Sequence, residues 1–139
     1  MPNGDLSRRA VVTGMGAITP IGNDVDTYWS NLLAGVPGGG PITTFDTTGH
    51  DVRIAAEVKG FDPLLTMDRK MARRMSRFIH FGVAAATEAV INSGLDFAAM
   101  SPEERDRAGV IVNTGGGGME QVINGADAIR DKGPGQVSP

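Results

Sequence analysis

Few side chains in this sequence could perform nucleophilic or acid–base chemistry. The 139 residues contain no cysteine, which removes disulfides, thiolate metal ligands and a cysteine nucleophile from this chain. His50 and His80 are the two histidines, and neither belongs to a cluster of carboxylates or to a Ser/His/Asp set. We therefore predict no metal site, and we interpret both histidines as structural or surface residues.

A glycine-rich stretch near the start, VVTGMGAITPIG, has some features of a dinucleotide-binding loop. Such loops use three glycines, for the turn, for the approach of the pyrophosphate and for helix packing. Thr19 stands where the third glycine should be, and Pro20 delays the next helix too far for its N-terminus to face a phosphate. A nucleotide-dependent oxidoreductase therefore remains an alternative and not the main hypothesis.

A second glycine-rich stretch, Thr114 to Met119, lies between a strand-like run and a helical pattern. Free backbone N–H groups in such a loop can cradle an anion. The stretch lacks the Lys-Ser/Thr ending of a Walker loop, so nucleoside triphosphate chemistry is not supported. Two interpretations stay open, contact with a ligand and the close approach of two backbones or two subunits.

The formal net charge is −3, but the basic residues are unevenly distributed. The stretch from Arg69 to Arg77 holds five of the 13 basic residues and no acidic one, which leaves 8 basic and 16 acidic residues elsewhere. One positive patch on an otherwise acidic chain argues against general nucleic-acid binding, which needs a broadly basic surface. A specific acidic partner and a merely solvated helix face both stay open.

The patch belongs to a stretch from Asp68 to Gly94 that is predicted to form one long, two-faced helix. At about 100° per residue, apolar side chains fall on one arc and the basic ones on the opposite arc. Gly94 is expected to end the helix in a left-handed conformation. The apolar arc consists of Met71, Met75, Phe78, Ile79, Gly82, Val83, Ala86 and Val90.

Strand and helix patterns alternate along the rest of the chain. Strands are expected at 9–13, 52–58 and 109–113. Helices are expected at 25–34 after a cap at Asn23 or Asp24, in a short segment after a capping box that starts at Ser101, and at 119–132. Residues 35–51 are expected to form a long irregular connection between the helix at 25–34 and the strand at 52–58. This order predicts an α/β fold with at least partly parallel strands.

The composition is that of an ordinary globular domain, with 40% hydrophobic and 21% charged residues. No linker divides the chain, so residues 1–139 are treated as belonging to a single domain. No run approaches the roughly 18 apolar residues that a membrane span requires, and the first residues lack the apolar region of a signal peptide. We expect a cytoplasmic protein without membrane or nucleic-acid partners.

Several motifs, in the order in which they stand, resemble the N-terminal part of the β-ketoacyl-acyl carrier protein synthase II family, which elongates fatty acids. They are VVTGMGAITPIG, YWSNLLAGVPG, FDTT, RKMARRMSRFIHFGVAAATEAVINSGL, GVIVNTGGGGME and GPGQVSP. The resemblance is colinear from about Arg8 to Pro139 and covers about the first third of a family member. It implies an α/β chain that forms the incomplete N-terminal half of a thiolase-like αβαβα fold, with 1–139 as a segment of the synthase N-terminal domain.

The resemblance implies transfer of an acyl group to an active-site cysteine and decarboxylative condensation with malonyl-acyl carrier protein. Family members use a cysteine thiolate, two histidines and a lysine, and all of these would lie beyond Pro139. No residue of this chain is therefore expected to be catalytic, the chain alone is expected to be inactive, and no cofactor is implied. An isolated polypeptide of residues 1–139 is predicted to be marginally stable or to associate with other chains.

One functional surface implied by the resemblance is a docking site for the acidic acyl carrier protein. The residues that match the family's basic helix face are Arg69, Lys70, Arg73 and Arg74. The family often adds a basic pair just before its Ser-Pro, where this chain has Gly135 and Gln136. A standalone, non-catalytic module that binds carrier protein is the main alternative, and it would need a self-contained core.

A second implied surface is the side of the acyl-chain pocket, near the dimer interface of a homodimeric parent. Gly115, Gly116 and Gly117 match this segment of the family. A bulky aliphatic residue commonly narrows that pocket, whereas this chain has Gly116. The hypothesis is a roomier pocket that accepts longer acyl chains.

Overall fold

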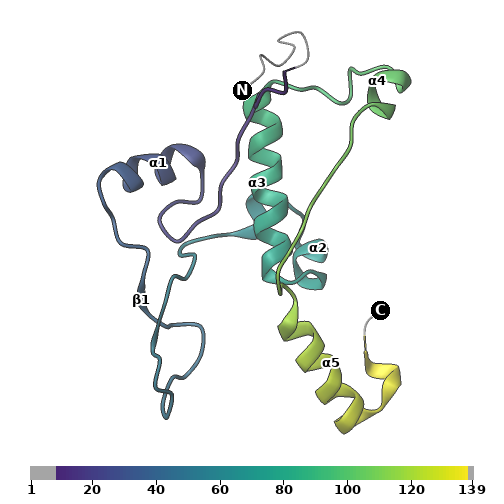
Figure 1. Ribbon diagram of the computed structural model, residues 1–139. Helices are drawn as coiled ribbons and strands as arrows, with labels where there is room; N and C mark the ends of the chain where they lie inside the picture. Colours follow the sequence, from purple (N-terminus) through teal and green to yellow (C-terminus); the bar gives the residue numbers. More distant parts are fainter. Residues whose placement is uncertain (1–8, 138–139) are drawn as a thin grey trace, which may run out of the picture.

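The computed structural model describes residues 9–137, and it consists of helices joined by long extended connections (Figure 1). The longest helix, α3, forms the axis to which the other parts attach (Figure 1). In chain order the elements are α1 (Val25–Leu33), β1 (Gly40–Pro41), β2 (Ile54–Ala55), the 3₁₀ helix η2 (Pro63–Leu65), α2 (Arg69–Arg74), α3 (Arg77–Ser93), α4 (Pro102–Asp106), α5 (Met119–Lys132) and the 3₁₀ helix η3 (Pro134–Gln136). Arg8 and Pro139, the ends of the predicted resemblance, lie outside the described residues.

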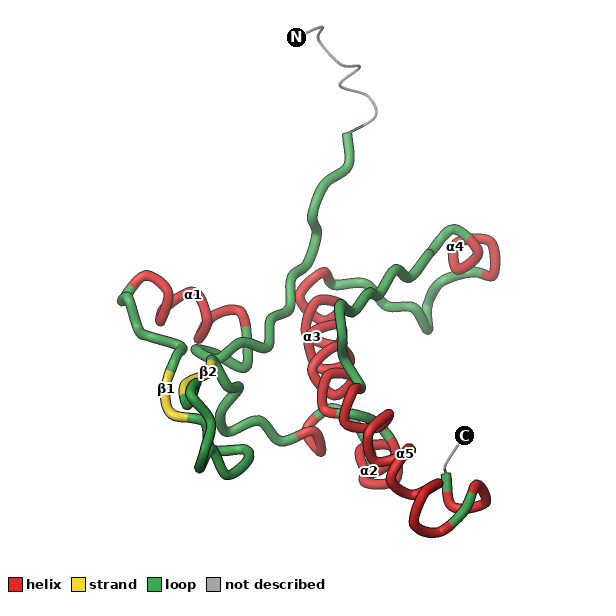
Figure 2. Tube along the Cα trace, turned by 60° about the horizontal axis from the view of Figure 1, so that its bottom comes forward, coloured by secondary structure: helices red, strands yellow, loops and turns green. Residues whose placement is uncertain are grey.

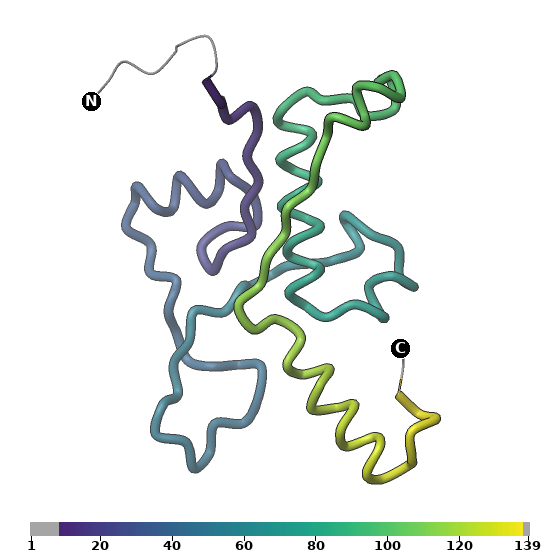
Figure 3. Tube along the Cα trace, turned by 45° about the vertical axis from the view of Figure 1, so that its right-hand side comes forward, coloured from purple at the N-terminus to yellow at the C-terminus, as the bar shows by residue number. Residues whose placement is uncertain are grey.

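Two extended segments run along α3, one before α1 and one between α4 and α5 (Figures 1 and 3). The first crosses the helix at Gly14 and Gly16. A Cβ at Gly14 would collide with the carbonyl oxygen of Ala89, and a Cβ at Gly16 would collide with that of Ala85. These glycines therefore allow two backbones to approach closely, which accounts for them without a bound dinucleotide.

Polar side chains of α3 hold this N-terminal segment in place. The Glu88 carboxylate accepts hydrogen bonds from the backbone N–H of Ala17 and of Val25, each at 2.8 Å. Asn92 accepts a third bond from the N–H of Met15 at 3.2 Å. Val25 is the first residue of α1, so Glu88 satisfies one of the N–H groups that a helix start leaves without an intrahelical partner.

The helix caps agree with the sequence patterns. Asp24, one of the two predicted caps of α1, accepts a hydrogen bond from the Thr27 N–H, and this bond lowers the pKa of the Asp24 carboxyl, with help from the Thr27 hydroxyl. Ser101 begins α4 with the predicted capping box, which Glu104 completes. Gly94 ends α3 with a φ of 72°, in the predicted left-handed conformation.

The single long helix predicted from Asp68 to Gly94 is wrong, because the structure breaks it into α2 and α3. Met75 (φ −104°, ψ 145°) and Ser76 (φ −67°, ψ 155°) are extended, and Ser76 is the residue before the first turn of α3. Serine is a preferred residue at helix starts, since its short side chain competes for backbone hydrogen bonds inside a helix. Ser76 is also buried, at 6% exposure, although its side chain makes no capping hydrogen bond to α3.

The predicted parallel pairing is not present among residues 9–137. The segments at 9–13 and 109–113 are extended but form no hydrogen-bonded ladder, and the predicted strand at 52–58 is reduced to Ile54–Ala55. That short strand pairs antiparallel with Gly40–Pro41, inside the connection predicted to be irregular. A strand needs a partner backbone, and the apolar segment at 110–112 has none here, with Ile111 91% exposed.

The described residues bury very little apolar surface. The accessible surface is 11239 Å², whereas a compact monomer of 14.5 kDa would expose about 6900 Å². Met67 and Ala84 are the only hydrophobic residues among 9–137 that are buried. Figure 2 shows the same openness, with α4 projecting away from the other helices. Within 9–137, no helix has both the length and the apolar composition needed to cross a bilayer.

Candidate functional site

The basic residues predicted to dock a partner lie together on α2. All four are exposed; they form two adjacent pairs that are four positions, about one helical turn, apart, so they share one side of the helix. We call this surface the basic face of α2; its members are Arg69, Lys70, Arg73 and Arg74. Asp68 caps the helix by accepting hydrogen bonds from the N–H groups of Lys70 at 2.8 Å and Met71 at 2.9 Å.

The charges on the basic face of α2 are not neutralised inside the described part of the chain. The one ion pair found among residues 9–137 joins Arg130 to Asp127, both on α5. Four neighbouring cations without carboxylate partners repel one another and attract anions from solvent. The arrangement can therefore bind an acidic surface, with a strength that salt would reduce.

Arg77, the fifth basic residue of this stretch, is engaged within the structure. Its guanidinium donates a hydrogen bond to the carbonyl oxygen of Val58 at 3.0 Å and lies 5.0 Å from the centre of the Phe81 ring. Phe81 in turn packs edge-to-face against Phe61. The predicted basic arc therefore divides into four residues on α2 that have no carboxylate partner among 9–137 and one, Arg77, that ties the start of α3 to the segment after β2.

His80 links the two helices across the break. Its Nε2 lies 2.9 Å from the carbonyl oxygen of Ala72, which belongs to the last turn of α2. A carbonyl oxygen can only accept, so the Nε2–H group is the donor in this bond. The structural role predicted for His80 is thus observed, although its partner could not be identified from the sequence.

The predicted acyl-pocket glycines have two different environments. A Cβ at Gly115 or Gly116 would meet no atom within 4 Å, whereas a Cβ at Gly117 would collide with the Phe78 ring and with the Thr114 hydroxyl. The N–H of Gly117 donates to the Thr114 hydroxyl at 2.8 Å, so this donor is not free to hold an anion. The loop begins with two open glycines and ends packed against the first turn of α3.

An apolar groove lies beside this loop, between α3 and the extended segment that follows α4. Its volume is about 450 Å³. One wall is Val112, Asn113 and Thr114. The other wall consists of residues of the predicted apolar arc, namely Phe78, Ile79, Gly82, Val83 and Ala86. On α3 these residues therefore lie on one side of the helix, as predicted, and that side faces the segment predicted to be a strand.

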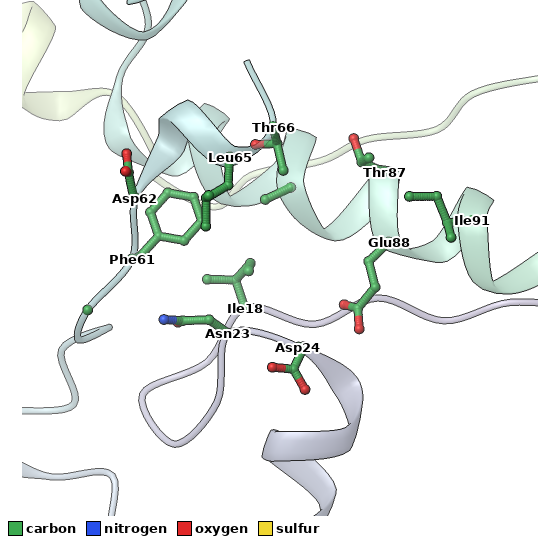
Figure 4. A pocket seen from close by; sticks show the side chains of 12 residues that line it. Ile18, Asn23, Asp24, Phe61, Asp62, Leu65, Thr66, Thr87, Glu88 and Ile91 are labelled. Atoms are coloured by element: carbon green, nitrogen blue, oxygen red, sulfur yellow. The ribbon is translucent and has the colours of Figure 1, made fainter. Parts of the chain in front are cut away.

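A second hollow, of about 300 Å³, contains three carboxylates, but the structure gives each of them a backbone partner (Figure 4). Glu88 binds the N–H groups of Ala17 and Val25, Asp24 caps α1, and Asp62 accepts from the N–H of Leu64 at 2.9 Å. In this hollow the carboxylates therefore orient the backbone of the N-terminal segment, of α1 and of η2. Glu88 was not identified from the sequence as an anchor for the N-terminal segment. The feature that could have indicated it is a single acidic residue within the apolar part of a helix.

His50 lies in the loop between β1 and β2 and packs edge-to-face against Phe45 at 5.9 Å. It is therefore not part of a set with His80, which lies on α3. Across residues 9–137, no group of three or more His, Cys, Asp or Glu side chains has the arrangement of a metal site.

The backbone resembles two solved ketosynthase structures. It matches "the ishigamide ketosynthase/chain length factor" with a TM-score of 0.73 and 33% identity, covering 95% of this chain and 32% of that one. It also matches a type II polyketide synthase acyl-carrier protein in complex with its ketosynthase bound to the hexaketide, with a TM-score of 0.71, 26% identity, and coverage of 93% and 32%. These structures define the class of protein as ketosynthase-like and confirm the predicted thiolase-like α/β fold.

The sequence comparisons identify the family. Residues 7–138 match the family model "Beta-ketoacyl synthase, N-terminal domain", and the chain belongs to this family. Three similar relatives carry the name 3-oxoacyl-[acyl-carrier-protein] synthase 2: one from Synechocystis sp. (43% identity), one from Vibrio cholerae (46%) and one from Staphylococcus aureus strain COL (45%). The matches cover 95%, 95% and 96% of this chain, and the chain spans 31% of the length of each relative.

Proposed function

We propose that this chain is the N-terminal segment of a condensing enzyme that elongates acyl chains by decarboxylative condensation with malonyl-acyl carrier protein. The segment supplies carrier-protein docking, part of the fold, and part of the acyl-pocket and dimer surface of a homodimer. It supplies no catalytic side chain. The names of its relatives and the complex of one structural neighbour with an acyl-carrier protein support this proposal.

The observation that carries the docking role is the basic face of α2. Its four side chains are exposed and have no carboxylate partner within residues 9–137. Acyl carrier protein is acidic, so attraction between the two surfaces would raise the rate of encounter and fix the orientation. The 3₁₀ helix at 134–136 adds no charge, because its residues are Pro134, Gly135 and Gln136.

The small amount of buried surface supports a segment that acts inside a larger protein. Just two hydrophobic residues among 9–137 are buried, while Val110, Ile111 and Val112 are 74–91% exposed. A standalone carrier-binding module would need a core of its own. The relatives, of which this chain spans 31%, have the additional length that could cover these surfaces.

Charge reversal in the protein that contains this segment tests the docking role. We expect Arg73→Glu with Arg74→Glu to weaken binding of acyl carrier protein at least 10-fold at low salt and to leave reaction with small acyl thioesters unchanged. The matched control is Arg107→Glu with Lys132→Glu, which makes the same change in net charge at two exposed positions outside α2. Equal carrier binding by the native protein and the α2 variant would refute the proposal.

A further inference from the structure

The basic face of α2 lies on a helix that is too short to be stable alone. α2 has six residues, whereas isolated helices shorter than about 12 residues are marginal in water. None of its residues is buried, so packing contributes little to holding it. Whatever keeps α2 helical and oriented must come from its caps and from bonds to neighbouring segments.

The N-terminal end of α2 has its own cap, and the C-terminal end depends on α3. Asp68 caps the first turn. At the other end, the carbonyl groups from Ala72 onward have no intrahelical donor, because the chain turns extended at Met75. The N–H of Met75 bonds to the Met71 carbonyl at 3.1 Å, and the side chain of His80 bonds to the Ala72 carbonyl.

The His80 bond differs from the others because it joins α2 to a separate helix. His80 lies in the first turns of α3, and its own backbone N–H bonds to the Ser76 carbonyl at 3.3 Å. The imidazole therefore reaches back over the extended residues and fixes the last turn of α2 relative to α3. Ala72 lies between Lys70 and Arg73, so an anchor at its carbonyl orients the basic residues on both sides.

From this geometry we propose that His80 is the positioning residue of the docking surface. It does not contact the partner. It holds α2 helical and at a fixed angle to α3, so that the four cations are presented as one preorganised face. This inference rests on the proposed carrier-protein docking, and it predicts that docking can be weakened without changing any charge on α2.

The test uses the full-length protein that contains this segment and two variants at position 80. His80→Leu has similar size but no donor, whereas His80→Gln retains an N–H donor at a comparable reach. We expect His80→Leu to raise KM for acyl carrier protein substrates about 2- to 10-fold, with kcat unchanged. We expect His80→Gln to restore the native KM. An unchanged KM in His80→Leu, or an equal defect in both variants, would overturn the role of the hydrogen bond.

Hydrogen exchange separates this inference from the docking proposal, because it needs no carrier protein. Amides bonded within α2, such as those of Ala72 and Met75, should exchange faster in His80→Leu and at the native rate in His80→Gln. If exchange responds while the Arg73/Arg74 charge reversal leaves carrier binding intact, the docking proposal fails and the positioning of α2 stands. If exchange does not respond, the positioning role fails.

A measurement on the native protein covers the case in which His80→Leu does not fold. Nitrogen-15 shifts of the imidazole report which ring nitrogen carries the proton. A protonated Nε2 is expected because the Ala72 carbonyl can only accept. An Nε2 without a proton would overturn the proposal.

Discussion

Phe78 and Gly117 approach so closely that the Phe78 ring occupies the space a Cβ on Gly117 would need. The pair joins the first turn of α3 to the loop that leads into α5. Since Phe78 also lines the apolar groove, the position of the glycine loop and the shape of the groove depend on the same ring.

Gly117→Ala should therefore displace the Phe78 ring and destabilise the protein that contains this segment by about 1–3 kcal/mol. Gly115→Ala is the matched control, because a Cβ there meets no atom within 4 Å. Urea unfolding of both variants measures the difference. In a double-mutant cycle, Phe78→Ala should remove part of the extra cost of Gly117→Ala, since the Thr114 hydroxyl also lies close to the new Cβ, and strict additivity would contradict the contact.

If the protein that contains this segment is the proposed condensing enzyme, Gly116→Ile should shorten the acyl chains that it accepts, because it adds a branched side chain at an open position of the proposed acyl-pocket loop. The measurement is the ratio of kcat/KM for long and short acyl carrier protein substrates. Gly109→Ile, at another open glycine outside the loop, should leave the ratio unchanged. An unaltered ratio in Gly116→Ile would remove the glycine loop from the acyl pocket.

Gly16→Ala should destabilise the contact between the N-terminal segment and α3, since its Cβ would collide with the Ala85 carbonyl. We expect a loss of about 1–3 kcal/mol in the free energy of unfolding. Gly109→Ala is the control, because that site is open and its φ is not positive. The amides of Ala17 and Val25, which bond to Glu88, should also exchange faster in Gly16→Ala.

Glu57 should make the β1–β2 region sensitive to acid. Its carboxylate accepts hydrogen bonds from the hydroxyl groups of Thr44 and Thr43 and from their N–H groups, and these bonds lower its pKa from 4.5 to about 2. Because the folded-state pKa is depressed, the stabilisation is complete above the unfolded value of 4.5 and is lost as pH falls through about 2.

Amide exchange at Thr43 and Thr44, corrected for intrinsic rates, should accordingly rise relative to a neutral-pH reference as the pH falls from 4.5 towards 2. Glu57→Gln should raise the exchange rate of these amides at all pH values and should remove the increase between pH 4.5 and about 2. Asp51→Asn, at a nearby exposed carboxylate, should retain the increase. If the exchange rate rises equally in Glu57→Gln, a group other than Glu57 is responsible for the acid sensitivity.

The sequence was most informative where local chemistry decides the structure. The Ser101 capping box and Gly94 each fix a helix end through bonds to residues a few positions away, as predicted, and Asp24 is one of the two residues predicted to cap α1. The family was likewise recognised from ordered motifs, and residues 7–138 match its model. Short-range rules of this kind need no knowledge of the rest of the fold.

Most of the errors concern features that depend on distant residues, and one concerns a break inside a helical pattern. The run at 109–113 has the composition of a strand, but a ladder also requires a partner backbone. The break at Ser76 was hidden because the apolar and basic arcs continue across it at helical spacing. The contact between His80 and Ala72 and the two bonds of Glu88 could not be foreseen, since periodicity indicates which side of a helix a residue occupies and not what it touches.

The bonds between the N-terminal segment and α3 also set an order of events during synthesis. They join residues that are 63 to 77 positions apart, so closing the intervening loop costs about 4 kcal/mol of chain entropy before any bond forms. At about 5–20 residues per second, a ribosome needs about 3–13 s to pass from Val25 to Glu88. For that interval the residues from Met15 to Val25 have been made but their hydrogen-bond partners on α3 have not, so this segment cannot take its final position until α3 has been synthesised.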